Sequence, residues 1–247
     1  MELIYTGVGK KVYHDGDKLI KVFDHQSYSK ADVLNEALNH ARVENSTLDI
    51  PKILGVSVME GDWALTSEYI EGDTLETLMQ KHPEKTEEYL NLFVDLQVRM
   101  SKEKVPLLGH LRDKMHNKIS SSSFPASVRY DLHMRLDGLP RHVKLCHGDF
   151  QPSNIIIAKN GTPYIIDWAH ATQGNGSADA ARTYLLFKLQ GKDELAEKYL
   201  KLFCLKTDTA IQYVQRVLPI VAASQSVKKK SGEAEFLAKW VNVFDWQ

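Results

Sequence analysis

The chain is poor in cysteine and has no long apolar run. Its 247 residues include two cysteines, Cys146 and Cys204, each alone in apolar surroundings. Lone cysteines of this kind are typical of reduced, buried thiols rather than of a disulfide framework. The longest apolar stretches, such as residues 217–223, are far too short to span a bilayer. The first residues also lack the features of a secretory signal. These absences predict a soluble, cytoplasmic protein that does not enter a membrane.

A strong excess of charge of either sign is missing as well. The net charge is −1 and the pI is near 6.8, which argues against nucleic acid as the main partner. The one basic run in the sequence, residues 228–230, is closely followed by Glu233 and Glu235. This mixture of charges is typical of a solvated helix face. The length permits one large domain or two lobes and leaves the oligomeric state open.

Strand-like and helical patterns are unevenly distributed along the chain. Alternating apolar residues predict strands over residues 5–13, 18–23, 54–59 and 63–70. Helical spacing predicts helices over residues 29–44, 74–81, 86–103, 111–121, 126–136, 178–189, 193–204, 209–224 and 232–243. We therefore predict an α+β fold with a small β-rich lobe, residues 1–70, and a larger helical lobe, residues 71–247. The boundary is expected where Gly72 ends a strand before a helix begins.

The most informative motif lies in the predicted helical lobe. The stretch HGDFQPSN, residues 147–154, places Asp149 five residues before Asn154, and Asp167 follows thirteen residues after Asn154. In phosphoryl transfer, one carboxylate can take the proton of the acceptor hydroxyl, while hard oxygen ligands hold Mg²⁺ against the phosphates. We predict that Asp149 is catalytic, that Asn154 and Asp167 bind Mg²⁺, and that the donor is ATP or GTP. The alternative is that Asp149 caps a turn and Asn154 begins a strand.

The residues after the motif predict how the two metal ligands come together. Residues 155–158 and 163–167 are strand-like and are joined by Asn160-Gly161, a strong hairpin signal. Such a hairpin brings Asn154, at its start, back beside Asp167, at its end. Both side chains would then be carried by one rigid element, as a metal site requires.

A lysine in the first lobe is predicted to contact the nucleotide. Lys21 lies on a strand in apolar company, and a buried ammonium group needs a partner. Glu36, on the following helix, is the expected partner, giving the lysine–glutamate pair that holds nucleotide phosphates in kinases. Lys18 and Glu44 compete for this assignment, and a plain surface lysine is a further alternative.

Two backbone segments complete the predicted nucleotide site. Gly7 and Gly9 lie in a turn between extended segments, where backbone N–H groups can approach phosphates closely. An ordinary hairpin turn is the alternative, because no third glycine follows. The connector that contains Glu68 and Ile70 is expected to meet the adenine edge through its backbone.

Several of these segments resemble the aminoglycoside phosphotransferase and choline kinase-like family. The resemblance is densest over residues 142–185 and rests on residues 67–72 with Leu75, 147–154, 166–168 and 178–183. It implies a bilobal protein-kinase-like fold and phosphorylation of a small molecule's hydroxyl with ATP or GTP. It also implies that Asp149 is the catalytic aspartate and that Asn154 and Asp167 bind Mg²⁺. By the same resemblance, Lys21 contacts phosphate and His147 is structural and braces the loop.

Two departures from protein kinases favour a small-molecule acceptor. Gln151 stands where Ser/Thr protein kinases carry a lysine. About ten residues separate Asp167 from the helix predicted at Ala178, and no Ala-Pro-Glu follows, so a long activation segment has no room. Two alternatives stay open: an atypical protein kinase and a catalytically silent nucleotide-binding protein of the same fold.

The sequence says less about the acceptor. We expect a small hydroxyl compound, with neither nucleic acid nor a membrane as partner. A cationic acceptor, such as an aminoglycoside or a choline-like compound, is somewhat favoured because the carboxylates of the metal site give the cleft a negative field. Residues available for a pocket, with surface charge or buried core as their alternative, are Asp179, Glu233, Glu235, Asp245, Trp168, His170, Trp240 and Trp246. Asp179 is instead expected to organise the fold around Arg182.

Overall fold

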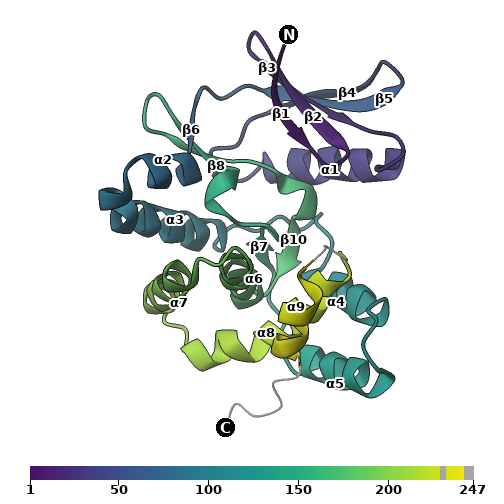
Figure 1. Cartoon of the computed structure of the whole chain (residues 1–247), viewed down its shortest axis with the longest axis vertical. Helices are drawn as coiled ribbons and strands as arrows, with labels where there is room; N and C mark the ends of the chain where they lie inside the picture. Colours follow the sequence, from purple (N-terminus) through teal and green to yellow (C-terminus); the bar gives the residue numbers. More distant parts are fainter. Residues whose placement is uncertain (229–231, 242–247) are drawn as a thin grey trace. The chain divides into compact units, whose positions relative to one another are not determined.

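The computed structural model describes residues 1–228 and 232–241, and its contacts divide the chain into two compact units (Figure 1). Unit 1 comprises Met1–Thr86 and Pro152–Ala171, and unit 2 comprises Glu87–Gln151 and the chain from Thr172 onward. The units therefore do not follow the boundary expected near residue 70. The reason is that residues 152–171 pair with the strand that begins at Gly72. A functional division at residue 70 stays a prediction.

Unit 1 is built on a five-stranded antiparallel sheet in the order β1-β2-β3-β5-β4, with helix α1 packed against β4 and β5 (Figure 1). Its elements are β1 (Glu2–Gly7), β2 (Lys10–Asp15), β3 (Lys18–Phe23), α1 (Lys30–Val43), β4 (Ile53–Met59) and β5 (Asp62–Glu68). A capping box at Ser29 and Asp32 begins α1, which stabilises such a helix by about 1 kcal/mol. The apolar core between helix and sheet contains Phe23, Val33, Ala37 and Leu65.

A second sheet in unit 1 joins two distant segments of the chain. Its three strands, in the order β6-β8-β9, are β6 (Gly72–Thr74), β8 (Ile155–Ala158) and β9 (Pro163–Ile165). The predicted hairpin is confirmed: β8 and β9 pair antiparallel, and Gly161 in the turn has a φ of +85°. The prediction that Gly72 ends a strand is wrong: β5 ends at Glu68, and Gly72 begins the separate strand β6. A Cβ at Gly72 would collide with the backbone carbonyl of Ile157, so the close approach of β6 to β8 requires glycine.

Short helices complete unit 1, and unit 2 is mainly helical. Unit 1 also contains α2 (Leu75–Lys81), η1 (Pro83–Lys85), η2 (Pro152–Asn154) and η3 (Trp168–His170). Unit 2 contains α3 (Thr86–Met100), α4 (Leu111–Ser120), α5 (Ala126–Asp137), β7 (Lys144–Cys146), β10 (Thr172–Gly174), α6 (Gly176–Leu189), α7 (Asp193–Thr207), α8 (Ile211–Ser226) and α9 (Ala234–Val241). Strands β7 and β10 pair antiparallel. None of the helices in the described part of the chain is long and apolar enough to cross a membrane.

Helix α6 forms the centre of unit 2 (Figure 1). It packs against α7 and α8, and every residue from Ala178 to Phe187 is buried. Phe187 joins Phe93 of α3 and Tyr199 of α7 in an aromatic cluster. Because buried charged side chains need partners, Asp179 and Arg182 on this helix each form hydrogen bonds inside the unit.

Most predicted elements are confirmed within a few residues, with some exceptions. The stretch 5–13 is divided by a turn at Val8-Gly9, and β6, β7 and β10 were not predicted as strands. All three are three-residue strands, too short to show a period, and β6 and β10 each contain a glycine. Cys146 and Cys204 are free and buried, as predicted. The last predicted helix, residues 232–243, extends beyond the described residues.

Candidate active site

The predicted Lys21–Glu36 pair is present in unit 1, and Asp167 joins it. The Lys21 Nζ donates to Glu36 Oε1 at 3.0 Å and to Asp167 Oδ1 at 3.4 Å. The Lys10 Nζ lies 3.8 Å from the other carboxylate oxygen of Asp167. Burial disfavours the Lys21 ammonium form, but the Asp167 and Glu36 carboxylates outweigh burial and raise the Lys21 pKa. Lys21 therefore stays a cation, which the predicted contact with phosphate requires.

The local folds explain why these residues meet. Lys21 lies in the middle of β3, between Val12 of β2 and Leu65 of β5, while Glu36 is on the buried face of α1. The competing residue Glu44 accepts a hydrogen bond from the backbone N–H of Ile53 at 2.7 Å. Its carboxylate is thus used to fix the start of β4, and the structure supports the Lys21–Glu36 assignment.

Asp167 has an uncommon backbone conformation. Its φ and ψ are 65° and 61°, in the left-handed region that costs a non-glycine residue about 1 kcal/mol. The chain is fixed on both sides: the Ile166 N–H donates to the Asn154 carbonyl at 3.0 Å, and the buried Trp168 donates its ring N–H to the Ile165 carbonyl at 3.0 Å. Residues held in such conformations by their surroundings are concentrated at functional sites.

The two predicted metal ligands lie at the same end of the β8–β9 hairpin. The Asn154–Ile166 backbone hydrogen bond places Asn154 opposite the residue that precedes Asp167. An amide oxygen and a carboxylate are hard donors of the kind that Mg²⁺ prefers. The carboxylate of Asp167 is also a quarter exposed, so a ligand can reach it. The chemistry of the donor set fits a magnesium ion.

The predicted glycine turn lies between β1 and β2. Gly9 has a φ of +68°, and a Cβ there would lie 2.6 Å from the Cβ of Ser27. The Gly9 carbonyl accepts a hydrogen bond from the Asp24 N–H at 2.9 Å, so the turn is packed on the segment after β3. At Gly7 a Cβ would lie 2.8 Å from the ring of Tyr5. The left-handed backbone therefore favours glycine at position 9, whereas a Cβ at position 7 would only displace the end of the exposed Tyr5 side chain; a contact of either residue with phosphate stays a prediction.

The predicted adenine connector follows β5. Glu68 ends this strand, and its backbone N–H donates to the Lys52 carbonyl at 2.9 Å. The Glu68 carboxylate accepts from the Lys52 N–H at 3.0 Å. Ile70 is half-buried between β5 and β6. The backbone N–H of Glu68 is therefore already used within the fold, and contact of Glu68 and Ile70 with adenine stays a prediction.

In unit 2 the Asp149 loop is held by a buried carboxylate. Asp179 on α6 accepts hydrogen bonds from the backbone N–H groups of His147, at 3.1 Å, and Gly148, at 2.7 Å. Burial raises the pKa of Asp179, and the neighbouring His147 and the two N–H donors oppose this. His147 is fully buried, and its Nδ1 accepts from the Asp149 N–H at 3.2 Å. These contacts confirm that His147 braces the loop and that Asp179 organises the fold.

Arg182, one turn further along α6, binds the same loop through the Gly148 carbonyl and the Asp149 side chain. Its Nε donates to the Gly148 carbonyl, and its Nη2 lies 3.3 Å from Asp149 Oδ1. Its Nη1 donates to Gln225 Oε1 of α8 at 2.9 Å. Asp149 is thus oriented by a guanidinium group that is itself fixed by Gln225, and its catalytic role stays a prediction.

Two lysines of α4 act electrostatically on the group of charges that contains Asp149 and Arg182. Lys114 and Lys118 lie four residues apart on α4, which packs against α8. Burial, and then the charge of Arg182, lowers the pKa of Lys114 to about 8 and that of Lys118 to about 7. Lys228 adds to this effect, and Asp149 opposes it. Neither lysine was predicted as a site residue, although their spacing of four on a helix is visible in the sequence.

The other candidates for a pocket have ordinary roles. Trp168 is buried in unit 1, and the Trp240 ring meets the Tyr184 ring edge-on at 6.0 Å. Glu233 accepts from the Gln225 side chain at 2.9 Å, and Glu235 pairs with Lys239. Asp245, Trp246 and two lysines of the basic run, Lys229 and Lys230, lie outside the described residues.

The two units together have the features of a kinase-like phosphotransferase. Unit 1 has a lysine–glutamate pair on its five-stranded sheet and a hairpin with two oxygen donors, and unit 2 has an aspartate loop held by a buried carboxylate. The sequence supports this class directly. Residues 8–213 match the Phosphotransferase enzyme family, and the chain belongs to this family. No match was found among curated proteins.

Solved structures show the same fold at low sequence identity. Aminoglycoside phosphotransferase APH(4)-Ia is 15% identical with a TM-score of 0.72, and the match covers 98% of this chain and 91% of that chain. Choline kinase LicA from Streptococcus pneumoniae is 16% identical with a TM-score of 0.68, covering 98% and 93%. A complex of a thermostable APH(4)-Ia mutant with ADP and hygromycin B is 15% identical with a TM-score of 0.71, covering 98% and 91%. The predicted α+β, protein-kinase-like fold is confirmed.

Proposed function

We propose that this phosphotransferase moves the γ-phosphoryl group of ATP or GTP to a hydroxyl group of a small molecule, with Asp149 as the catalytic residue. The proposal rests on the hydrogen bonds that fix Asp149 and its loop. A buried carboxylate, Asp179, fixes the backbone of its loop, and Arg182 fixes its side chain. A carboxylate held in this way, five residues before Asn154 in the family's motif, suits the acceptor side of the reaction.

The proposed step forms one bond and breaks one. The acceptor hydroxyl oxygen attacks the γ-phosphorus, and the new oxygen–phosphorus bond forms as the bond to the β,γ-bridging oxygen breaks. The electron pair of the broken bond leaves with the nucleoside diphosphate. The hydroxyl proton passes to the Asp149 carboxylate. Asp149 contributes by orienting the hydroxyl and accepting its proton, effects worth about 10²–10⁴-fold in rate.

The cluster in unit 1 is proposed to hold the nucleotide. Lys21, oriented by Glu36, would contact the phosphates, and Asn154 and Asp167 would hold Mg²⁺. When bound, the metal ion neutralises the charge that develops on the phosphoryl oxygens. The backbone around Gly7 and Gly9 would cover the phosphates, and the backbone at Glu68 and Ile70 would meet the base. Support comes from the kinase-like fold and from the structural relatives described with ADP or AMP-PNP.

A small acceptor is favoured over a peptide. Helix α6 begins at Gly176, nine residues after Asp167, and β10 occupies part of that interval, so the chain has no long activation segment there. The relatives named above point the same way, since one is described with hygromycin B and another is a choline kinase.

The charges in unit 2 favour an acceptor that carries a negative group. Asp149 and Asp179 are bound by Arg182 and by backbone donors, and Lys118 and Lys114 of α4 act electrostatically on the same group of charges. This argues against the cationic preference that the sequence suggested, because that preference considered the carboxylates alone. We therefore propose a hydroxyl compound with a carboxylate or phosphate group.

The test is an acceptor screen with matched pairs. The purified protein is incubated with Mg²⁺ and either ATP or GTP, together with glycerol or glycerate, glucose or gluconate, choline, and a peptide mixture. Mass spectrometry then detects any product that has gained one phosphoryl group. We expect transfer to a small hydroxyl compound, with the anionic member of a pair preferred. Transfer to peptides alone would show a protein kinase, and nucleotide binding without any transfer would show a silent binding protein.

A further inference from the structure

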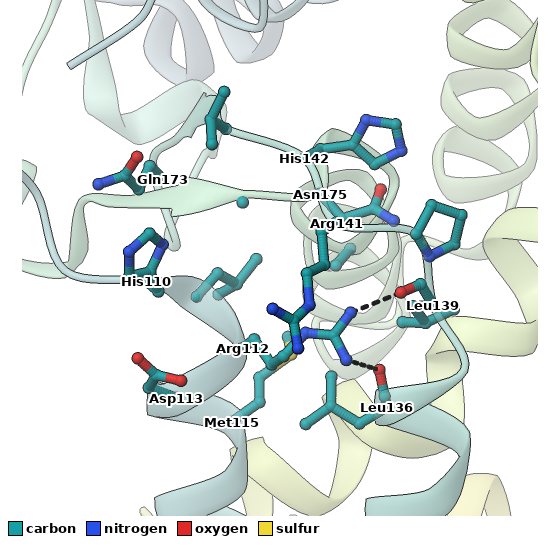
Figure 2. Close-up of a pocket in the computed structure, with 15 residues that line it drawn as sticks. His110, Arg112, Asp113, Met115, Leu136, Leu139, Arg141, His142, Gln173 and Asn175 are labelled. Atoms are coloured by element: carbon teal, nitrogen blue, oxygen red, sulfur yellow. Dashed lines mark hydrogen bonds between the residues drawn. The ribbon is translucent and has the colours of Figure 1, made fainter. Parts of the chain in front are cut away.

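Unit 2 contains a cavity of about 350 Å³ that the proposed reaction does not use (Figure 2). Its walls come from the start of α4, the segment between α5 and β7, and the stretch that leads from β10 into α6. Leu111, Met115, Leu136 and Ala178 give it an apolar lining. Cavities that bind small molecules begin at about 300 Å³, so this one has room for a compact organic ligand.

One guanidinium group in the cavity wall is rigidly held. Arg112 donates through Nη1 to the Leu136 carbonyl at 2.8 Å and through Nη2 to the Leu139 carbonyl (Figure 2). The same Nη1 lies 3.3 Å from the Asp137 carboxylate. Three acceptors at the end of α5 therefore fix the guanidinium plane without using all five of its donors.

A second guanidinium group, that of Arg141, also lines the cavity. Within residues 1–228 and 232–241, Arg141 makes neither a hydrogen bond nor an ion pair. Figure 2 shows its side chain directed to the middle of the cavity, as is that of Arg112. The imidazoles of His110 and His142 also line the cavity, and Asp113 is the one carboxylate among its described lining residues. The cavity therefore has an apolar lining together with two guanidinium groups and one carboxylate among its described residues.

The cavity is lined by other residues than those that bind Asp149. The residues that hold Asp149, which are His147 and Arg182, do not line it. Its walls nevertheless belong to elements that support the catalytic loop, because β7 leads into that loop and Ala178 precedes Asp179. A ligand there would contact the scaffold of the loop and leave its reacting groups free.

We propose that this cavity binds a small organic anion, with a carboxylate or phosphate group on Arg141 and Arg112 and an apolar body against Leu111, Met115 and Leu136. The planar donor fork of arginine matches both groups in a bidentate manner. The apolar lining selects for an anion with a hydrocarbon part over a bare inorganic ion. The inference does not depend on the proposed kinase activity.

The test uses probes that lack a hydroxyl group and so are not acceptors. Isothermal titration of the full chain measures the affinities of benzoate and phenyl phosphate, with benzamide as the neutral match of benzoate and inorganic phosphate as the bare ion. The decisive variant is Arg141→Leu, which changes an exposed side chain that has no hydrogen-bond or ion-pair partner in the described part of the chain. The matched control is Arg216→Leu, which removes an exposed arginine of α8 that does not line the cavity.

We expect the two organic anions to bind more tightly than benzamide and inorganic phosphate. Arg141→Leu should weaken their binding at least about tenfold, the loss expected for a charge-assisted contact, while Arg216→Leu should not change it. Asp149→Asn should also leave probe binding unchanged, which separates this cavity from the acceptor site. The proposal is overturned by equal affinities for benzoate and benzamide, by no binding of either anion, or by full binding in Arg141→Leu.

Discussion

The ammonium group of Lys21 and the carboxylate of Glu36 form an ion pair at 3.0 Å, and both side chains are largely buried. Replacing Lys21 with Met should destabilise the fold by about 3 kcal/mol, because the Glu36 and Asp167 carboxylates then lose their shared cation. It should also weaken nucleotide binding. Thermal unfolding and nucleotide titration measure the two effects separately.

The control for this prediction is the double variant Lys21→Met with Glu36→Leu. Removing both partners takes away the uncompensated charge on Glu36, so stability should recover in part. Nucleotide binding should not recover, because the phosphate contact is still missing. Recovery of both properties would show that Lys21 is only a structural residue.

Asp179 should matter for the Asp149 loop rather than for the nucleotide. Asp179→Ala leaves the buried N–H groups of His147 and Gly148 without an acceptor, at a cost of about 1–3 kcal/mol for each. Turnover should fall strongly, while nucleotide affinity should change little. The turnover of Asp179→Asn, which keeps one acceptor oxygen, should lie between that of the wild type and that of Asp179→Ala. Equal turnover in the wild type and Asp179→Ala would contradict the bracing role.

The affinity for an anionic acceptor should depend on pH. The pKa values of Lys118 and Lys114 are lowered to about 7 and about 8, mainly by burial. Both lysines are charged below this range and lose their protons as the pH rises through it, so the Michaelis constant for an anionic acceptor should increase between about pH 7 and 8. Lys118→Met should weaken binding and flatten this dependence, whereas Lys201→Met, which changes an exposed lysine of α7, should behave as the wild type.

Gly72→Ala tests the joining of the two distant segments in unit 1. The added methyl group would meet the backbone carbonyl of Ile157, which cannot move aside as a flexible side chain can. We expect a loss of about 1–3 kcal/mol in the free energy of unfolding, measured by denaturant titration. Gly109→Ala is the control, because a Cβ at Gly109 has nothing within 4 Å. A stability of Gly72→Ala equal to that of the control would mean that β6 does not need glycine.

Sequence reasoning was most successful where a short interval of the chain determines the geometry. The turn at Asn160-Gly161 sets the β8–β9 pairing, which in turn places Asn154 opposite the residue before Asp167. The Lys21–Glu36 pair could be predicted because an apolar strand and the helix after it leave few places for a buried ammonium group. In both cases the deciding contacts are local, or join consecutive elements.

Features that depend on distant packing were missed. The pairing of Gly72 with Ala158 in β8 joins segments whose sequences show no sign of each other. The positive surroundings of Asp149 arise because α4 packs against α8, so the charges of Lys114 and Lys118 act near Arg182. The cavity at Arg141 is likewise assembled from three separate stretches. Counting carboxylates in the sequence therefore could not include the lysines that α4 brings near Arg182, and the charge of the acceptor stays a prediction.

The most direct test of the central claim compares Asp149→Asn with Asp167→Asn. Calorimetry measures the affinity for ATP or GTP with and without Mg²⁺, and product formation with the best acceptor from the screen measures turnover. Asp149→Asn should keep metal-dependent nucleotide affinity within a few-fold of the wild type and lose about 10²-fold or more in turnover. Asp167→Asn should lose both, because the metal ligand and the lysine contact are weakened together. Undiminished turnover in Asp149→Asn, or undiminished Mg²⁺-dependent affinity in Asp167→Asn, would contradict these roles.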